Sequence, residues 1–122
     1  MFQVSQDQFE DLLEQALHSL PEKHIKSLKN VALIVDDLPS LDQRIKLRLF
    51  GDQTLLGLYE GVPLSKRQGV QKLLPDKITI FKLPIEARSN SLVDLKEQIR
   101  HTLWHEIAHY YGLDHKAISE LE

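Results

Sequence analysis

The sequence contains no cysteine, and this absence limits the chemistry open to the chain. Without Cys there are no disulfides, and any zinc ion must be held by nitrogen and oxygen atoms alone. Long apolar runs are missing too, since the longest fall far short of the roughly 20 residues that span a bilayer. The sequence therefore predicts neither a disulfide-stabilised protein nor a membrane protein.

An excess of basic residues is also absent. The net charge is −3 and the pI is about 6.1, and the Lys and Arg residues are scattered along the chain. No basic face of the kind that neutralises phosphates is expected, so nucleic acid is a disfavoured partner. Residues 1–7 carry neither a positive region nor an apolar run, so they do not form a signal peptide, and we expect a cytoplasmic protein.

What is present fits one globular domain. The 122 residues are 42% hydrophobic and 27% charged, which are ordinary values for a globular chain of this length. No repeat, linker or low-complexity stretch divides the sequence. We therefore assign residues 1–122 to a single domain, with no separate substrate domain.

Helical signals are clearest in the first part of the chain. Ser5 and Gln8 form a capping-box pattern, after which apolar residues recur with helical spacing as far as Leu20. Pro21 can begin a short second helix. Residues 40–50 fit both an alternating strand and a capped helix, and the helix is the interpretation we favour.

Three segments have the composition of strands. Residues 31–35 are a continuous apolar run, and residues 78–83 alternate and are rich in β-branched side chains, with Pro84 expected to end their pairing. In residues 55–64 the glycines at Gly57 and Gly61 indicate a close approach of the backbone or a bend.

A solvated, mobile loop is expected over residues 65–74. The order of the predicted helices and strands favours an α+β fold, in which a small mixed sheet has helices packed on one side. The order of the strands within that sheet is left open.

The last predicted helix carries the most informative motif. Ser91 caps a helix that runs from about 92 to 111, and from His105 the sequence reads H-E-x-x-H-x-x-G-x-x-H. His105 and His109 lie one turn apart on one face, so both can bind one Zn²⁺. Glu106 lies beside that face, where the general base of a metal site belongs.

Two further positions complete the predicted site. Gly112 can take a positive φ and end the helix, so that the chain turns back and offers His115 as a third ligand, with Asp114 as the alternative. Three protein ligands leave one tetrahedral position for water, as in catalytic zinc sites. The predicted metal ligands are thus His105, His109 and His115.

Such a site predicts metal-assisted hydrolysis. Zinc lowers the pKa of its water to about 7, and Glu106 would take the proton as hydroxide attacks a carbonyl. A peptide or protein substrate could bind in extended form at a sheet edge, for which residues 56–62 and 78–83 are the candidates.

Neighbouring polar residues receive other roles. His101, one turn before the motif, is expected to line the cleft rather than to bind the metal. Tyr110 and Tyr111 could donate to an oxyanion, but both fit the apolar arc of the helix, which favours packing. His18 and His24 lack metal-site spacing and are interpreted as surface or packing residues.

Over most of its length the sequence resembles the small bacterial zincin-like metallopeptidases, also called minimal metalloprotease-like proteins. The resemblance rests on Leu-Gly-Leu-Tyr-Glu-Gly-Val-Pro at residues 56–63 and on the H-E-x-x-H helix. It implies a zincin-like α+β fold, a Zn²⁺ at His105 and His109, and Glu106 as the base. It implies no particular substrate.

Departures from related groups leave alternatives open. In this family the third ligand is often acidic, so both Asp114 and His115 remain candidates. Metzincin peptidases share the full motif but place a Met turn beneath the metal, whereas Met1 is the one methionine here. Bacterial zinc endoribonucleases of ribosomal RNA maturation have three His at this spacing, with Gly where Glu106 stands. A zinc-binding module without turnover is a third possibility.

Overall fold

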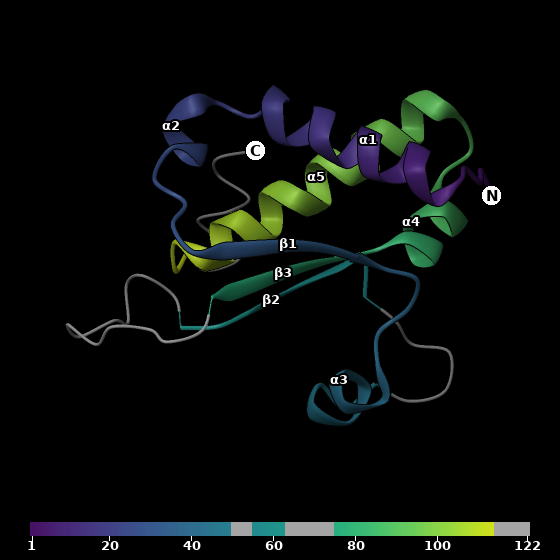
Figure 1. Ribbon diagram of the computed structural model, residues 1–122. Coiled ribbons are helices and arrows are strands. Elements are labelled where there is room, and N and C mark those ends of the chain that lie inside the picture. Colours follow the sequence, from purple (N-terminus) through teal and green to yellow (C-terminus); the bar gives the residue numbers. More distant parts are fainter. Residues whose placement is uncertain (50–54, 63–74, 114–122) are drawn as a thin grey trace.

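A three-stranded mixed sheet forms the centre of the fold (Figure 1). The computed structural model describes residues 1–49, 55–62 and 75–113. The strands are β1 (Val31–Asp36), β2 (Gly57–Glu60) and β3 (Asp76–Phe81), in the spatial order β1-β3-β2. β1 runs parallel to β3 and β2 runs antiparallel to it. Among the strands that the structure describes, β3 is therefore the central one, and β2 lies at an edge.

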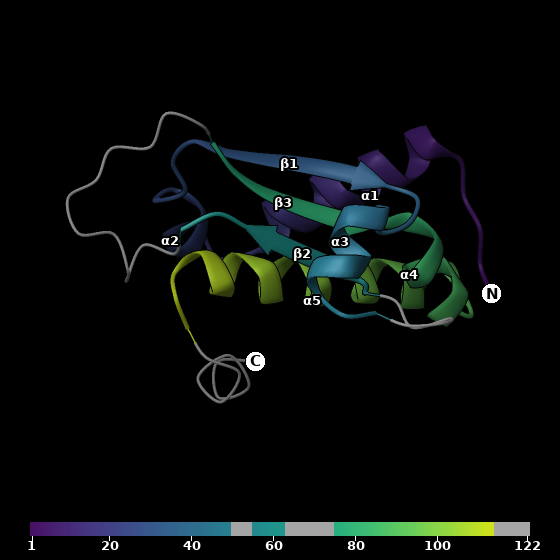
Figure 2. The same cartoon turned by 90° about the horizontal axis from the view of Figure 1, so that it is seen from below.

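Two helices cover one face of this sheet. α1 (Gln6–Ser19) and α5 (Leu92–Tyr110) lie side by side on that face, and the short α3 (Leu41–Lys46) lies on the opposite side (Figures 1 and 2). Phe9 of α1 and Leu103 of α5 are completely buried, and each such burial stabilises the fold by roughly 1.5–3 kcal/mol. The predicted α+β fold, with a small mixed sheet and a long C-terminal helix, is confirmed.

Capping boxes fix the starts of two helices. The Ser5 hydroxyl accepts a hydrogen bond from the Gln8 N–H at 3.1 Å, and the Gln8 side-chain oxygen accepts one from the Ser5 N–H at 3.0 Å. Ser40 and Gln43 make the same reciprocal pair at the start of α3. The helix favoured for that segment is therefore confirmed. The second short helix, α2 (Glu22–Ile25), follows α1 as expected.

The prediction around Pro84 is wrong. β3 ends at Phe81, and Pro84 is buried in the first turn of a helix, α4 (Lys82–Arg88), that we did not predict from the sequence. Proline is tolerated there because the first N–H groups of a helix have no acceptor within it. The signal that was missed is the pair Lys82 and Glu86, four residues apart, whose side chains form a 3.0 Å ion pair.

Other expectations are only partly covered by the structure. The strand expected within residues 55–64 is β2, whereas the loop predicted over residues 65–74 lies outside the described residues. Within the described parts of the chain, no helix is both long enough and apolar enough to cross a membrane.

Candidate metal centre

The C-terminal half of α5 carries a cluster of metal-binding side chains. One donor atom from each of His105, Glu106 and His109 lies within 4.8 Å of the other two. The rings of His105 and His109 have their centroids 4.8 Å apart and are inclined by 74°. Their spacing in the sequence explains this, because one helical turn brings both side chains to the same face. The helix thus brings two imidazoles and a carboxylate together.

An N-cap and a buried apolar face hold α5 in place. The Ser91 hydroxyl accepts a hydrogen bond from the Asp94 N–H at 3.1 Å, as predicted. Further along, Leu103 and Ile107 are completely buried, whereas the two histidines of the cluster are only half-buried. The helix therefore packs with its apolar side against the core and turns the imidazoles towards the surface.

Glu106 is buried against His109. Its Oε1 atom lies 3.1 Å from Nδ1 of His109, and the glutamate is only 6% exposed. The hydrogen bond to Glu106 is the main reason that the pKa of His109 is raised above 6.5; burial of the ring acts the other way, and the negative charge of Glu106 adds to the increase. Because a metal ion binds only the neutral imidazole, metal binding at His109 competes with the proton that this hydrogen bond favours.

β2 approaches this part of α5 closely because Gly57 has no side chain. A Cβ atom at this position would lie 2.7 Å from Cγ2 of Thr102 and 3.2 Å from Cγ of Glu106. The close approach predicted for Gly57 is thus confirmed. Thr102 is a neighbour of the site that the sequence-based prediction missed, and its place one turn before Glu106 is the only signal that could have indicated it.

The end of α5 follows the prediction for Gly112. This glycine has φ of +84°, and the N–H groups of Gly112 and Leu113 donate to carbonyls of the last turn at 2.9 and 3.1 Å. These are the two hydrogen bonds of a Schellman motif. The candidate third ligands, Asp114 and His115, come next in the sequence but lie outside the described residues. The choice between them stays a prediction.

Three other histidines are separate from the cluster. The His101 ring has its centroid 6.4 Å from that of His105, and His101 is exposed. His24 packs against Trp104 with ring centroids 4.7 Å apart, and His18 lies exposed on α1. These positions agree with the interpretation of His101 as a cleft residue and of the other two as packing and surface residues.

The two tyrosines at the end of α5 anchor the segment around α2. Tyr110 is 1% exposed, and its hydroxyl accepts a hydrogen bond from the Lys29 N–H at 3.4 Å. The Tyr111 hydroxyl donates to the His24 carbonyl at 2.6 Å. These contacts agree with the packing role that we favoured over an oxyanion donor.

The sheet places one of the two predicted peptide-binding segments out of reach. Residues 78–81 belong to β3, which is paired on both sides, and residues 82–83 belong to α4. The candidate segment 78–83 is therefore wrong, because a central strand cannot accept another strand. The other candidate, residues 56–62, contains β2, the edge strand that approaches Glu106.

The donor set fits a zinc ion. Imidazole nitrogens and carboxylate oxygens are the ligands that zinc takes in a protein without cysteine. They lie on one side of a long helix whose other side is buried against a mixed sheet. The fold and the cluster together define the class: an α+β protein whose long C-terminal helix carries a candidate metal site.

Comparison with known proteins agrees with this class. Residues 28–122 match the family described as zincin-like metallopeptidase, and the chain belongs to that family. Its fold is also similar to that of a conserved hypothetical protein from Thermus thermophilus, with a TM-score of 0.59 and 15% sequence identity over 97% of this chain and 100% of the other. No curated protein sequence matches.

Proposed function

We propose that this protein is a zinc-dependent peptidase in which His105 and His109 hold the metal and Glu106 is the general base. One observation carries the proposal: the Glu106 carboxylate is buried beside the two imidazoles, with donor atoms of all three residues within 4.8 Å. Membership of the zincin-like metallopeptidase family supports it. A carboxylate in this position can take up a proton next to a metal ion.

The residues of the site have separate tasks. When bound, zinc lowers the pKa of a coordinated water to about 7 and polarises the carbonyl of the substrate. His109 binds metal only in its neutral form, so a metal-bound His109 holds no extra proton beside the Glu106 carboxylate. Glu106 can accept the proton of the attacking water and pass it to the leaving amine.

The neighbouring strand supports a peptide as the substrate. β2 is an edge strand, and Gly57 brings it against α5 at the level of Glu106. An extended peptide can bind along such an edge through its main chain, while side chains on alternate residues give specificity. This arrangement favours a protein or peptide over a compact small molecule.

The third ligand is assigned by two separate substitutions. We propose His115, and Asp114 is the alternative. Asp114→Ala and His115→Ala are compared for zinc affinity, and the substitution of the true ligand should weaken binding more. If neither changes the affinity, a third ligand outside this pair is required.

A zinc endoribonuclease and a zinc-binding module without turnover are the rival functions. Glu106 argues against the ribonuclease, because the zinc endoribonucleases have Gly at the position where this chain has Glu106. The experiment incubates the zinc-loaded protein with casein, a peptide library and structured RNA. We expect peptide cleavage that stops on chelation and returns with Zn²⁺. Cleavage of RNA alone would favour the nuclease, and zinc binding without any turnover would favour the module.

A further inference from the structure

The sheet has a second border, on the side away from β2, and β1 forms it. β1 pairs with β3 on one side, and no other strand of the described residues pairs with it on the other (Figure 2). Residues 31–35 are all apolar, and Leu33 at their centre is 37% exposed. An open apolar edge strand is a template on which another strand can pair. The outer side of β1 is therefore a candidate surface for binding another chain.

The backbone of β1 presents hydrogen-bonding groups along this border. The Asn30 carbonyl accepts a hydrogen bond from the Asp76 N–H at 2.9 Å, so Asn30 directs its carbonyl towards β3. The N–H and C=O groups of successive strand residues point in alternate directions within the sheet, so those of Val31, Leu33 and Val35 point away from β3. Among the described residues, none forms a backbone hydrogen bond with these outward groups. Each of the three residues can therefore both donate to and accept from an added strand.

The sequence around Leu33 is complementary to itself when it is reversed. The apolar Val31 and Val35 lie two residues to either side of Leu33. The charged Lys29 and Asp37 lie four residues to either side, and both are exposed. Two antiparallel copies of β1 paired about Leu33 bring each Val31 opposite a Val35, and the same pairing brings each lysine beside an aspartate. Apolar pairs and opposite charges at facing positions stabilise an antiparallel pair. This pattern identifies a second copy of the chain as the partner.

Charges on the neighbouring helices extend this complementarity. The hollow between α1 and the end of β1 is lined by Val35 together with Glu10 and Glu14. The segment that leads into β1 carries the exposed Lys23 and Lys26. An antiparallel pairing brings the start of one β1 to the end of the other, so the basic segment of each copy comes towards the acidic side of its partner. A parallel pairing of the two copies would bring like charges together instead.

Apolar side chains at this border add buried surface to the strand pairing. Leu33 lines two hollows on the face of the sheet that the helices cover, and Leu17 of α1 lines both with it. Val31, Leu33 and Val35 point to the same face, because side chains alternate along a strand. At a two-fold axis the two copies of Leu33 would cover each other and lose their contact with water. The apolar row of one copy would thus continue into that of the other.

We propose that two copies of this protein pair through β1, antiparallel about Leu33, so that two three-stranded sheets join into one across a two-fold axis. Such an axis makes each contact occur twice, with the same residues on both copies. β2, the strand that approaches Glu106, lies at the opposite border of the sheet in each copy. The pairing leaves that border open, so it is independent of the proposed peptidase function.

Sedimentation equilibrium measures the state of the wild-type protein, whose chain has a mass of 14.1 kDa. A single strand pairing gives a small interface with an expected dissociation constant in the micromolar range, so about 100 μM protein should show twice the chain mass. Zinc and chelator should make no difference to this mass. Monomers at this concentration, or a spread of larger species, would overturn the proposal.

Amide hydrogen exchange locates the interface. The N–H groups of Val31, Leu33 and Val35 should exchange more slowly in concentrated protein than after dilution, because the second copy protects them. Those of Ala32 and Ile34 face β3 and should depend much less on concentration. A concentration dependence confined to other segments would contradict β1 as the interface.

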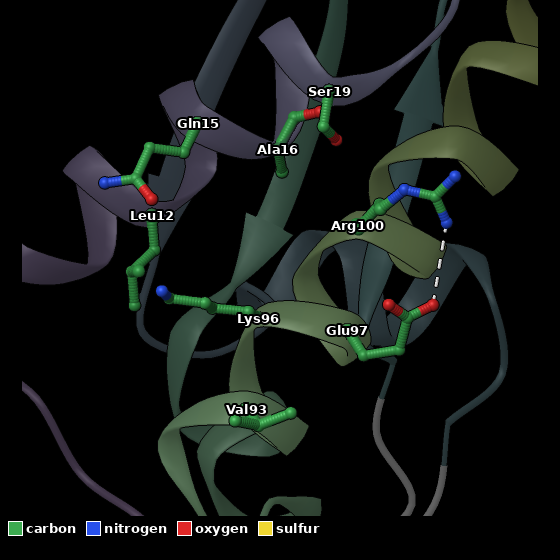
Figure 3. A pocket seen from close by; sticks show the side chains of 8 residues that line it. All are labelled: Leu12, Gln15, Ala16, Ser19, Val93, Lys96, Glu97 and Arg100. Atoms are coloured by element: carbon green, nitrogen blue, oxygen red, sulfur yellow. Dashed lines mark hydrogen bonds and ion pairs between the residues drawn. The ribbon is translucent and has the colours of Figure 1, made fainter.

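Charge reversal tests the antiparallel arrangement. Lys29→Glu and Asp37→Lys should each raise the dissociation constant about tenfold or more, because the axis repeats the like-charge contact. A mixture of these two variants restores opposite charges at both contacts, so heterodimers should form. Lys96→Glu changes the net charge as Lys29→Glu does but lies on α5, and it should dimerise like the wild type (Figure 3). Unchanged dimerisation of both single variants, or a mixture that forms no heterodimer, would contradict the pairing.

Leu33→Lys tests the centre of the interface. The two-fold axis would place both ammonium groups side by side, so this variant should be monomeric, and it should stay folded because Leu33 is already 37% exposed. Val93 is the matched control, since it is 79% exposed and lines a hollow between α1 and α5 (Figure 3). Val93→Lys should therefore remain a dimer, and urea denaturation checks that both variants fold. A Leu33→Lys protein that still dimerises would show that another surface is used and would overturn the proposal.

Discussion

Two of the glutamates in the described residues are buried, and they have different partners. Glu86 is 1% exposed; its two oxygens lie 3.0 and 3.1 Å from Nζ of Lys82, and it also accepts a hydrogen bond from the Val4 N–H at 2.8 Å. Glu106 is 6% exposed and lies 3.1 Å from a ring nitrogen of His109. One carboxylate has a lysine and a backbone amide for partners, and the other has a histidine.

The difference separates a carboxylate with fixed partners from one whose partner can change its protonation or bind a metal ion. The Lys82 ammonium does not coordinate zinc and the Val4 N–H is part of the backbone, so Glu86 keeps its surroundings and ties the N-terminal segment to α4. His109 can lose its proton or bind a metal ion, so the surroundings of Glu106 change with each event. A buried carboxylate with such a partner is where proton transfer is expected.

The largest predicted effect is on turnover by Glu106→Gln. The amide matches the carboxylate in size but cannot take up a proton, so kcat should fall by about 10²–10⁴-fold with little change in substrate binding. Zinc content and the free energy of unfolding should stay close to those of the wild type. Glu86→Gln is the matched control and should turn over normally when folded. Wild-type turnover by Glu106→Gln would show that the proposed mechanism is wrong.

The second prediction concerns Glu86 and the stability of the folded protein. Glu86→Gln leaves the Lys82 ammonium buried without its counter-charge, which should lower the free energy of unfolding by about 3–5 kcal/mol. Urea denaturation measures this. Adding Lys82→Met to Glu86→Gln removes the unpaired charge, and the amide oxygen of the new side chain can still accept from the Val4 N–H, so most of the stability should return. A Glu86→Gln protein as stable as the wild type would contradict the structural role.

A smaller effect is expected from Gly57→Ala. The new methyl group would press on Thr102 and Glu106, and overpacking of this kind costs about 1–3 kcal/mol. Turnover should fall as well, but less than in Glu106→Gln, because the carboxylate is displaced rather than removed. Adding Thr102→Ser deletes the methyl group in closest contact and should restore part of the stability. If Gly57→Ala changes neither the free energy of unfolding nor the turnover, the close approach of β2 to α5 is unimportant for the site.

The smallest effect concerns the pH dependence of the metal-free protein. Folding raises the pKa of His109 above 6.5, chiefly through its hydrogen bond to Glu106. The stabilisation from this pair is therefore fully present below pH 6.5 and is lost as the pH rises through the folded pKa. In chelated protein, the free energy of unfolding of the wild type should fall more over this range than that of Glu106→Gln. If the free energy of unfolding changes equally with pH in both proteins, the hydrogen bond between Glu106 and His109 does not stabilise the fold.

The features that were predictable from the sequence are those that depend on neighbours along the chain. Ser5 and Ser40 each sit three residues before a Gln, so the capping boxes of α1 and α3 could be read directly. His105 and His109 meet because helix geometry alone fixes residues four apart. The Schellman turn at Gly112 has a local cause as well.

The features that were missed depend on contacts between distant segments. The strand order β1-β3-β2 requires Val31 to pair with Asp76, and no local pattern specifies that register. The meeting of Gly57 with Thr102, and of His24 with Trp104, likewise arises only when the helices and the sheet come together. Pro84 is the exception: it looked like the end of a strand although the spacing of Lys82 and Glu86 was a local signal of α4.

The most direct test of the account is the zinc content of three histidine variants measured by elemental analysis. His105→Ala and His109→Ala should each lose stoichiometric zinc, because each removes one of the two clustered imidazoles. His101→Ala removes a neighbouring imidazole outside the cluster and should keep it. All three should remain folded, since the core is apolar and we expect it to hold the fold without the metal. Unchanged zinc in both His105→Ala and His109→Ala would contradict the proposed metal centre.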